Sequence, residues 1–301
     1  MGGFQFAPHL RYTLRSPGVL ELERRLGWTS RLFRSDTLSP SSPPRAVPLQ
    51  VLLKRDRTIV AVSLFAITAL AWTYLLHLAS RMGGMEMSTE VAMPQMDAWG
   101  PVELLLTFVM WSVMMIAMMI PSALPMILLF TKINRTRRGR EDTALPTATF
   151  VSGYLLAWTA LSALATLAQW GLHDAALLSP MMQSSSSLLG GGLLIAAGAY
   201  QWTPWKRACL IHCRSPLHFF MSEWHSGAFG ALRMGFRHGA YCVGCCWALM
   251  AVLFVAGVMN LLWVAAVAAF VLIEKIVPNG QFIGRAVGVA LMIIGLGVLV
   301  L

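Results

Sequence analysis

The chain has 301 residues, of which 57% are hydrophobic and only 12% are charged, and its mean hydropathy is +0.65. This composition is typical of a multi-span membrane protein and excludes an ordinary soluble domain. The formal net charge of +10 does not indicate nucleic-acid binding, because the basic residues are gathered in alternate connections between apolar segments.

Residues 1–57 form a basic, Ser/Pro-rich segment that holds ten of the Lys and Arg residues. The segment lacks the apolar stretch of a secretory signal, and its composition predicts a mostly disordered cytoplasmic tail. The remaining residues, 58–301, are predicted to form one transmembrane metal-binding domain.

Seven apolar segments are long enough to cross the hydrocarbon of a bilayer, which is about 30 Å thick. They are 58–79, 102–131, 147–170, 187–205, 240–259, 261–277 and 284–301. Lipid offers no partner to an unpaired backbone group, so each segment is expected to be a helix and the fold an all-α, polytopic transmembrane bundle. Every basic residue except Arg81 falls on one side of this arrangement. The positive-inside rule therefore predicts a multi-pass protein of the bacterial inner membrane, with its N-terminus in the cytoplasm and its C-terminus outside.

The first outer connection is rich in methionine, with five of these residues at positions Met82, Met85, Met87, Met93 and Met96. Thioethers are soft ligands that suit copper(I) and suit zinc poorly. Two interpretations stay open: a copper(I) capture site, or an interfacial segment that places Met side chains among lipid headgroups.

The second span carries a stripe of methionines at helical spacing, which includes Met114 and Met118. Pro121 and Pro125 interrupt the backbone hydrogen bonds of the same segment. Such a broken helix is tolerated where it is buried in protein or lines a cavity. The stripe therefore indicates either core packing or a path for a metal ion.

Two cysteine clusters share a spacing of three residues and then one, which places their members on one face of a helix. The first consists of Cys209, His212 and Cys213, and the second of Cys242, Cys245 and Cys246, with His238 four residues before it. Thiolate is a soft ligand that selects copper(I), zinc or iron–sulfur clusters. The clusters are predicted to converge at the cytoplasmic face, with sulfur atoms on the order of 4 Å apart if they share one ion. The alternative is that these cysteines are small hydrophobes that pack beside Gly244.

Glu274 and Lys275 are adjacent at the cytoplasmic end of the sixth apolar segment. Ionisable groups inside spans are functional candidates, but an ion pair between these two side chains is the competing interpretation.

Several stretches together resemble one family, the bacterial integral membrane proteins predicted to bind metal that carry a domain of unknown function. They are Trp111-Ser-Val-Met-Met-Ile-Ala-Met-Met-Ile-Pro121, Gly153-Tyr-Leu-Leu-Ala-Trp158, residues 200–216 around the first cysteine cluster, His238-Gly-Ala-Tyr-Cys242-Val-Gly-Cys-Cys-Trp247, and Glu274-Lys275. The resemblance covers about 58–301 and implies a polytopic helical protein with a bound metal.

These observations predict a membrane protein that binds copper(I), with zinc or iron as other possible metals, and that transfers or transports the ion. The expected partners are the lipid bilayer and a cytoplasmic or periplasmic metal carrier. Two alternatives stay open: a membrane thiol redox or metal-cofactor enzyme, and a structural zinc-bearing scaffold. No catalytic residue is predicted, because the chain has no Walker loop, dinucleotide fingerprint, zinc-protease motif or nucleophile elbow.

Overall fold

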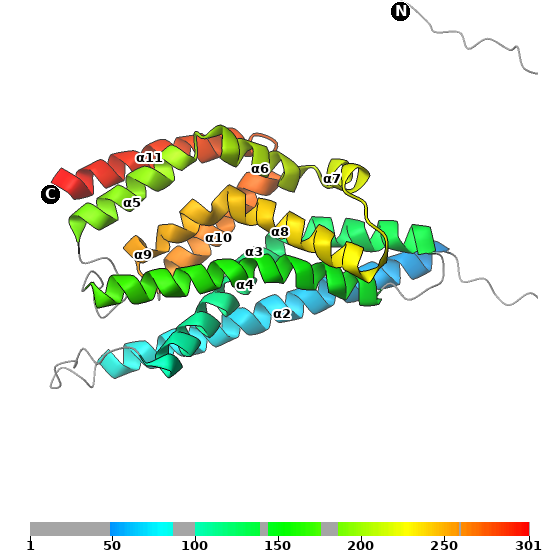
Figure 1. The fold of residues 1–301 in the computed structure, drawn as a ribbon, viewed down its shortest axis with the longest axis horizontal. Helices are drawn as coiled ribbons and strands as arrows, with labels where there is room; N and C mark the ends of the chain where they lie inside the picture. The colour runs from blue at the N-terminus through cyan, green and yellow to red at the C-terminus, as the bar shows by residue number, and fades with distance from the viewer. Residues whose placement is uncertain (1–48, 87–99, 139–143, 176–185, 259, 301) are drawn as a thin grey trace, which may run out of the picture. The chain divides into compact units, whose positions relative to one another are not determined.

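The structure is a computed structural model that describes residues 49–86, 100–138, 144–175, 186–258 and 260–300 (Figure 1). These residues belong to one compact unit, Pro48–Leu301. The predicted tail, 1–57, lies outside the described residues except for the start of the first described helix.

Helices make up almost all of the described residues, and none of these residues lies in a strand, as expected for an all-α fold. The helices are α2 (Leu49–Glu86), α3 (Pro101–Arg138), α4 (Ala144–Asp174), α5 (Ser187–Tyr200), α6 (Pro204–Arg214), α7 (Pro216–Ser222), α8 (Gly227–Ala251), α9 (Leu253–Ala256), α10 (Leu261–Ile276) and α11 (Gly280–Val300).

Five helices among the described residues, and not seven, are long and apolar enough to cross a membrane. They are Arg57–Arg81, Pro101–Arg137, Ala144–Asp174, Gly227–Ala256 and Gly280–Val300. The prediction of seven helices of spanning length was wrong because two apolar runs contain helices that end early. At about 1.5 Å per residue, the 14 residues of α5 and the 16 residues of α10 span less than the hydrocarbon thickness. The apolar run of 187–205 crosses a break at Gln201, and Pro204 starts the separate helix α6.

Helices α4 and α8 pack closely and run in the same direction (Figure 1). Gly153 lies against the backbone of Leu232 and Phe236, and Gly235 lies against the carbonyl of Phe150. A side chain at either glycine would hold the two helices apart, so these small residues allow the backbones to approach. This contact fixes the depth of the α8 side chains relative to those of α4.

Replacing Gly235 with Ala is expected to destabilise the protein by about 1–3 kcal/mol, toward the upper end of the range for overpacked sites. The physical reason is that a β-carbon at Gly235 would overlap the Phe150 carbonyl oxygen, and that backbone group cannot rotate away. The measurement is thermal unfolding of detergent-purified protein. Gly171→Ala in α4 is the matched control, because a β-carbon there meets nothing within 4 Å. Equal stability of the two variants would contradict the close α4–α8 contact.

The same kind of contact joins α5 and α11, which run in opposite directions. Gly191 lies against Gly295, and Gly198 lies against Gly288. Tight packing at these glycines makes α5 and α11 a closely joined pair (Figure 1).

Helix α3 supplies much of the apolar core and runs antiparallel to α4. Near one end, the Trp111 indole donates a 2.6 Å hydrogen bond to Gln169, and near the other, the hydroxyls of Thr131 and Thr147 lie 3.3 Å apart. Pro121 and Pro125 lie inside α3 without ending it.

Candidate metal centre

The three cysteines of α8 are buried inside the helix bundle. Cys242 and Cys246 have no exposed surface, and Cys245 is 1% exposed. The thiols of Cys245 and Cys246 each donate to the carbonyl oxygen of Cys242 over 3.0 Å. One helical turn therefore presents three sulfur atoms on the same side of α8.

Polar groups from α3, α4 and α10 gather around the Cys242 sulfur of α8. It lies 3.2 Å from the hydroxyl of Tyr154 on α4 and 2.9 Å from the ammonium group of Lys275 on α10. That ammonium group also donates to the hydroxyl of Ser122 on α3 over 3.0 Å. The tyrosine hydroxyl donates in turn to the carbonyl of Met119 over 3.2 Å. An ammonium group beside a thiol stabilises the thiolate form, which is the form that ligates soft metals.

These contacts place the cluster deeper than the sequence predicted. The apolar run of 240–259 suggested that Cys242 stands at the start of a span, but α8 begins at Gly227, well before the cysteines. Ser122 lies near the middle of α3, and Tyr154 lies in the first half of α4. The thiols of α8 therefore lie within the length of the long helices and not beyond their ends.

Helix α6 brings the first cysteine cluster to the second. Hydrogen bonds with Cys242 and Cys245, together with burial, raise the pKa of the Cys213 thiol well above its usual value. Burial, and then the neighbouring charge of Cys245, also raises the pKa of Cys209. A β-carbon on Gly244 would be 2.8 Å from the Cys209 sulfur, so this glycine leaves the space that Cys209 occupies. A raised pKa favours the protonated thiol, so a metal ion bound here would have to displace protons.

The two predicted histidine ligands have different surroundings. His238 is 3% exposed, its ring stacks near Tyr154 with centroids 5.6 Å apart, and its Nδ1 atom has no hydrogen-bond partner among the described residues. A buried ring nitrogen without a partner is a costly feature that a ligand would relieve. His212 stacks instead on Tyr241 at 4.4 Å, and its Nδ1 atom lies 2.8 Å from the carbonyl of Ala208 in its own helix.

The methionines fall into two groups. Met114 and Met118 are 1% and 2% exposed and belong to the main apolar core of the bundle. Met82 and Met85 fall in the last turns of α2, and Met87, Met93 and Met96 lie outside the described residues.

Sequence reasoning did not place the polar side chains of Tyr154, Ser122 and Lys275 near the thiols. It left open an ion pair between Glu274 and Lys275, but Glu274 forms a 2.7 Å ion pair with Lys206 of α6. Successive residues on a helix point about 100° apart, so the two side chains enter different parts of the bundle. This angle indicates that Lys275 and Glu274 have different partners, and the positions of the neighbouring helices then show that Lys275 faces the thiols.

The chemistry of the donors fits a soft, monovalent metal. All five cysteines are free thiols, and four of them, Cys213, Cys242, Cys245 and Cys246, are linked by hydrogen bonds. Among the described residues, no group of three or more His, Cys, Asp or Glu side chains is arranged as a preformed ligand set. A low coordination number built from thiolates is what copper(I) accepts, whereas structural zinc needs a tetrahedral set of four ligands.

The long apolar helices and the buried thiol cluster define an all-helical protein equipped with soft metal donors. Residues 108–298 match the model of a protein family, PpoB2, described as copper chaperone, and the chain belongs to this family. No curated protein and no solved structure matches the chain.

Proposed function

We propose that this protein is a multi-pass protein of the bacterial inner membrane that binds copper(I) as cargo at its thiol cluster and hands the ion to a carrier. The observation that carries the proposal is the Cys242 sulfur, buried among other thiols and 2.9 Å from the Lys275 ammonium group. The family's description as copper chaperone supports the choice of metal.

Charge balance at the thiols suits copper(I) held by two thiolates and disfavours a zinc ion held by four. A copper(I) ion held by two thiolates carries a net charge of −1, and the single positive charge of Lys275 neutralises it. A zinc ion held by four thiolates would carry −2 and leave one negative charge uncompensated. An uncompensated charge in a low-dielectric interior is costly, so the cluster suits the monovalent ion.

In the proposed route, the outer methionines Met82, Met85, Met87, Met93 and Met96 capture the ion, because thioethers bind copper(I). Met114 and Met118 line its passage along α3. The thiols of α6 and α8, with His212 and His238, hold it for the acceptor. Thiol exchange with a redox partner is a weaker alternative, because Cys242, Cys245 and Cys246 are at most 1% exposed.

The test is the metal content of detergent-purified protein loaded under reducing conditions with copper(I) or zinc. We expect stoichiometric retention of copper(I) and little retention of zinc. Stoichiometric zinc with no copper would overturn the copper assignment and favour a zinc-bearing scaffold. Replacing the five outer methionines with Leu keeps apolar volume, so it should lower copper uptake by cells while retention in purified protein stays unchanged.

The membrane topology gives a separate prediction. A reporter fused at Gly139 should be cytoplasmic, and one fused after Leu301 should be periplasmic, because basic residues flank the first position. Reporter activity in intact cells measures both positions. Finding both reporters on the same side would show that an even number of helices crosses the membrane between them.

A further inference from the structure

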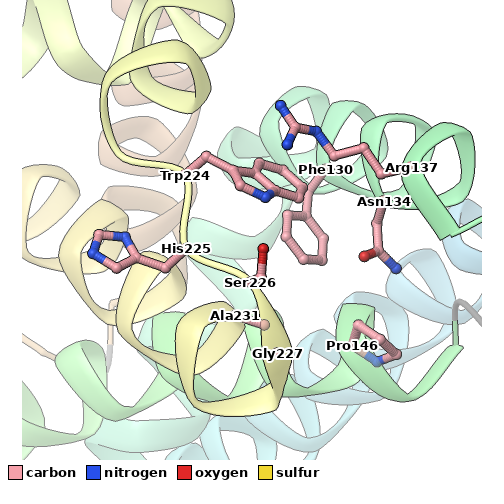
Figure 2. A pocket seen from close by; sticks show the side chains of 9 residues that line it. All are labelled: Phe130, Asn134, Arg137, Pro146, Trp224, His225, Ser226, Gly227 and Ala231. Atoms are coloured by element: carbon pink, nitrogen blue, oxygen red, sulfur yellow. The ribbon is translucent and has the colours of Figure 1, made fainter.

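A cavity of about 320 Å³ opens between the end of α3, the start of α4 and the start of α8, far along the helices from the thiols. Its described lining consists of Phe130, Asn134, Arg137, Pro146, Trp224, His225, Ser226, Gly227 and Ala231 (Figure 2). None of these nine residues is acidic. The cavity therefore offers a positive electrostatic potential to a negatively charged ligand.

Polar side chains line this cavity on three sides, those of Arg137, Ser226 and Asn134. The guanidinium group of Arg137 lies over the Trp224 ring, 4.5 Å from its centroid. Figure 2 shows the Ser226 hydroxyl pointing toward the rings of Phe130 and Trp224, while the His225 ring is turned away from Asn134. The Asn134 side chain is 4% exposed, and its Nδ2 atom has no hydrogen-bond partner within the part of the chain that the structure describes. A buried amide donor without a partner in a cavity wall is the feature that a bound acceptor would satisfy.

The beginning of α8 adds a fourth contribution. Ser226 is the N-cap residue, but its side chain makes no capping hydrogen bond to the helix. The first backbone N–H groups of this 25-residue helix point toward its N-terminal end, where the helix dipole favours an anion. A tetrahedral anion with several acceptor oxygens matches donors that approach from different directions better than a planar carboxylate does.

We infer that this cavity binds a phosphate group, held by Arg137, Asn134 and Ser226 at the start of α8. The group belongs either to a soluble phosphate or to the headgroup of an acidic phospholipid, since Trp224 and Phe130 provide apolar surface beside the donors. The site is separate from the thiol cluster, and it stands or falls independently of copper binding.

Thermal unfolding of the full-length protein, measured with increasing sodium phosphate at constant ionic strength, tests the soluble source. Constant ionic strength removes general screening. A second series in nanodiscs compares phosphatidylglycerol with phosphatidylcholine and tests the lipid source. We expect one of the two phosphate-bearing anions to raise the melting temperature, and Arg137→Gln to weaken its apparent affinity by about tenfold, because charge-assisted hydrogen bonds are the strong ones.

Arg137 and Ser226 are exposed, so Arg137→Gln and Ser226→Ala are expected to fold. Ser226→Ala should weaken binding less, because it removes one neutral donor. Arg285→Gln is the matched control, since its guanidinium group also lies over an indole ring, 5.5 Å from the centroid of Trp202, but in another part of the bundle. Stabilisation by neither anion, or an equal loss in Arg137→Gln and Arg285→Gln, would overturn the assignment.

Discussion

Replacing Cys242 with Ser is expected to abolish copper(I) retention by the purified protein. Its sulfur is the one that interacts with Lys275, with Tyr154 and with three other thiols, those of Cys213, Cys245 and Cys246. A hydroxyl does not provide the deprotonated soft ligand that copper(I) selects. The measurement is the copper-to-protein ratio after loading under reducing conditions and removal of free metal.

Cys209→Ser is the matched control for this prediction. Cys209 is half-buried and packs against Gly244. Among the described residues, its one interaction with an α8 thiol is the electrostatic interaction with Cys245. We expect Cys209→Ser to lower copper retention less than Cys242→Ser does. Lys275→Met should weaken retention by about tenfold, because hydrogen bonds to charged groups contribute about 1.5–3 kcal/mol. Unchanged retention in Cys242→Ser would reject the thiol cluster as the binding site.

Replacing Glu274 with Gln is expected to cost about 3–5 kcal/mol of stability, the range for breaking a buried ion pair by removing one partner. The side chains of Lys206 and Glu274 are 3% and 2% exposed, and their charged atoms lie 2.7 Å apart. Lys206 also donates to Gln201, but that amide carries no compensating charge. The substitution therefore leaves a buried ammonium group without an opposite charge. Thermal unfolding in detergent measures the loss.

The surface pair of Arg237 and Glu223 provides the control for this effect. Its charged atoms are 2.6 Å apart, but the two side chains are 43% and 19% exposed. Arg237→Gln should cost no more than about 1 kcal/mol, because water and salt screen exposed pairs. The double variant Lys206→Met, Glu274→Leu should recover much of the loss, since apolar replacements remove both buried charges. A small effect of Glu274→Gln alone would show that the pair is hydrated.

The variants Cys242→Ser and Glu274→Gln together distinguish an effect on copper binding from an effect on stability. Cys242→Ser should change copper content while the melting temperature changes little, because serine preserves the approximate shape of the side chain. Glu274→Gln should lower the melting temperature, and its copper content should follow the folded fraction. Equal changes of both quantities in both variants would mean that the thiols act on the fold alone.

The helical class and the membrane-like character of the chain follow from its sequence. A composition of 57% hydrophobic residues in long runs leaves helices as the practical way to satisfy backbone groups in lipid. The number of helices long enough to cross a membrane could not be predicted from the sequence, because hydropathy averaged over a window does not show where a helix ends. The turn at Gln201 and the separate helix that starts at Pro204 shorten α5, and α10 ends at Ile276 before Pro278.

The type of metal donor could also be predicted from the sequence, since thiols repeated at helical spacing must share a face. Which charges stand beside those thiols was decided by the tertiary structure alone. Lys275 and Glu274 are neighbours in the chain, yet one contacts Cys242 and the other pairs with Lys206. Sequence spacing gives the direction of a side chain around its own helix, but which helix lies in that direction depends on packing between segments far apart in the chain. The close contact that Gly153 and Gly235 allow between α4 and α8 brings the Tyr154 hydroxyl within 3.2 Å of the Cys242 sulfur.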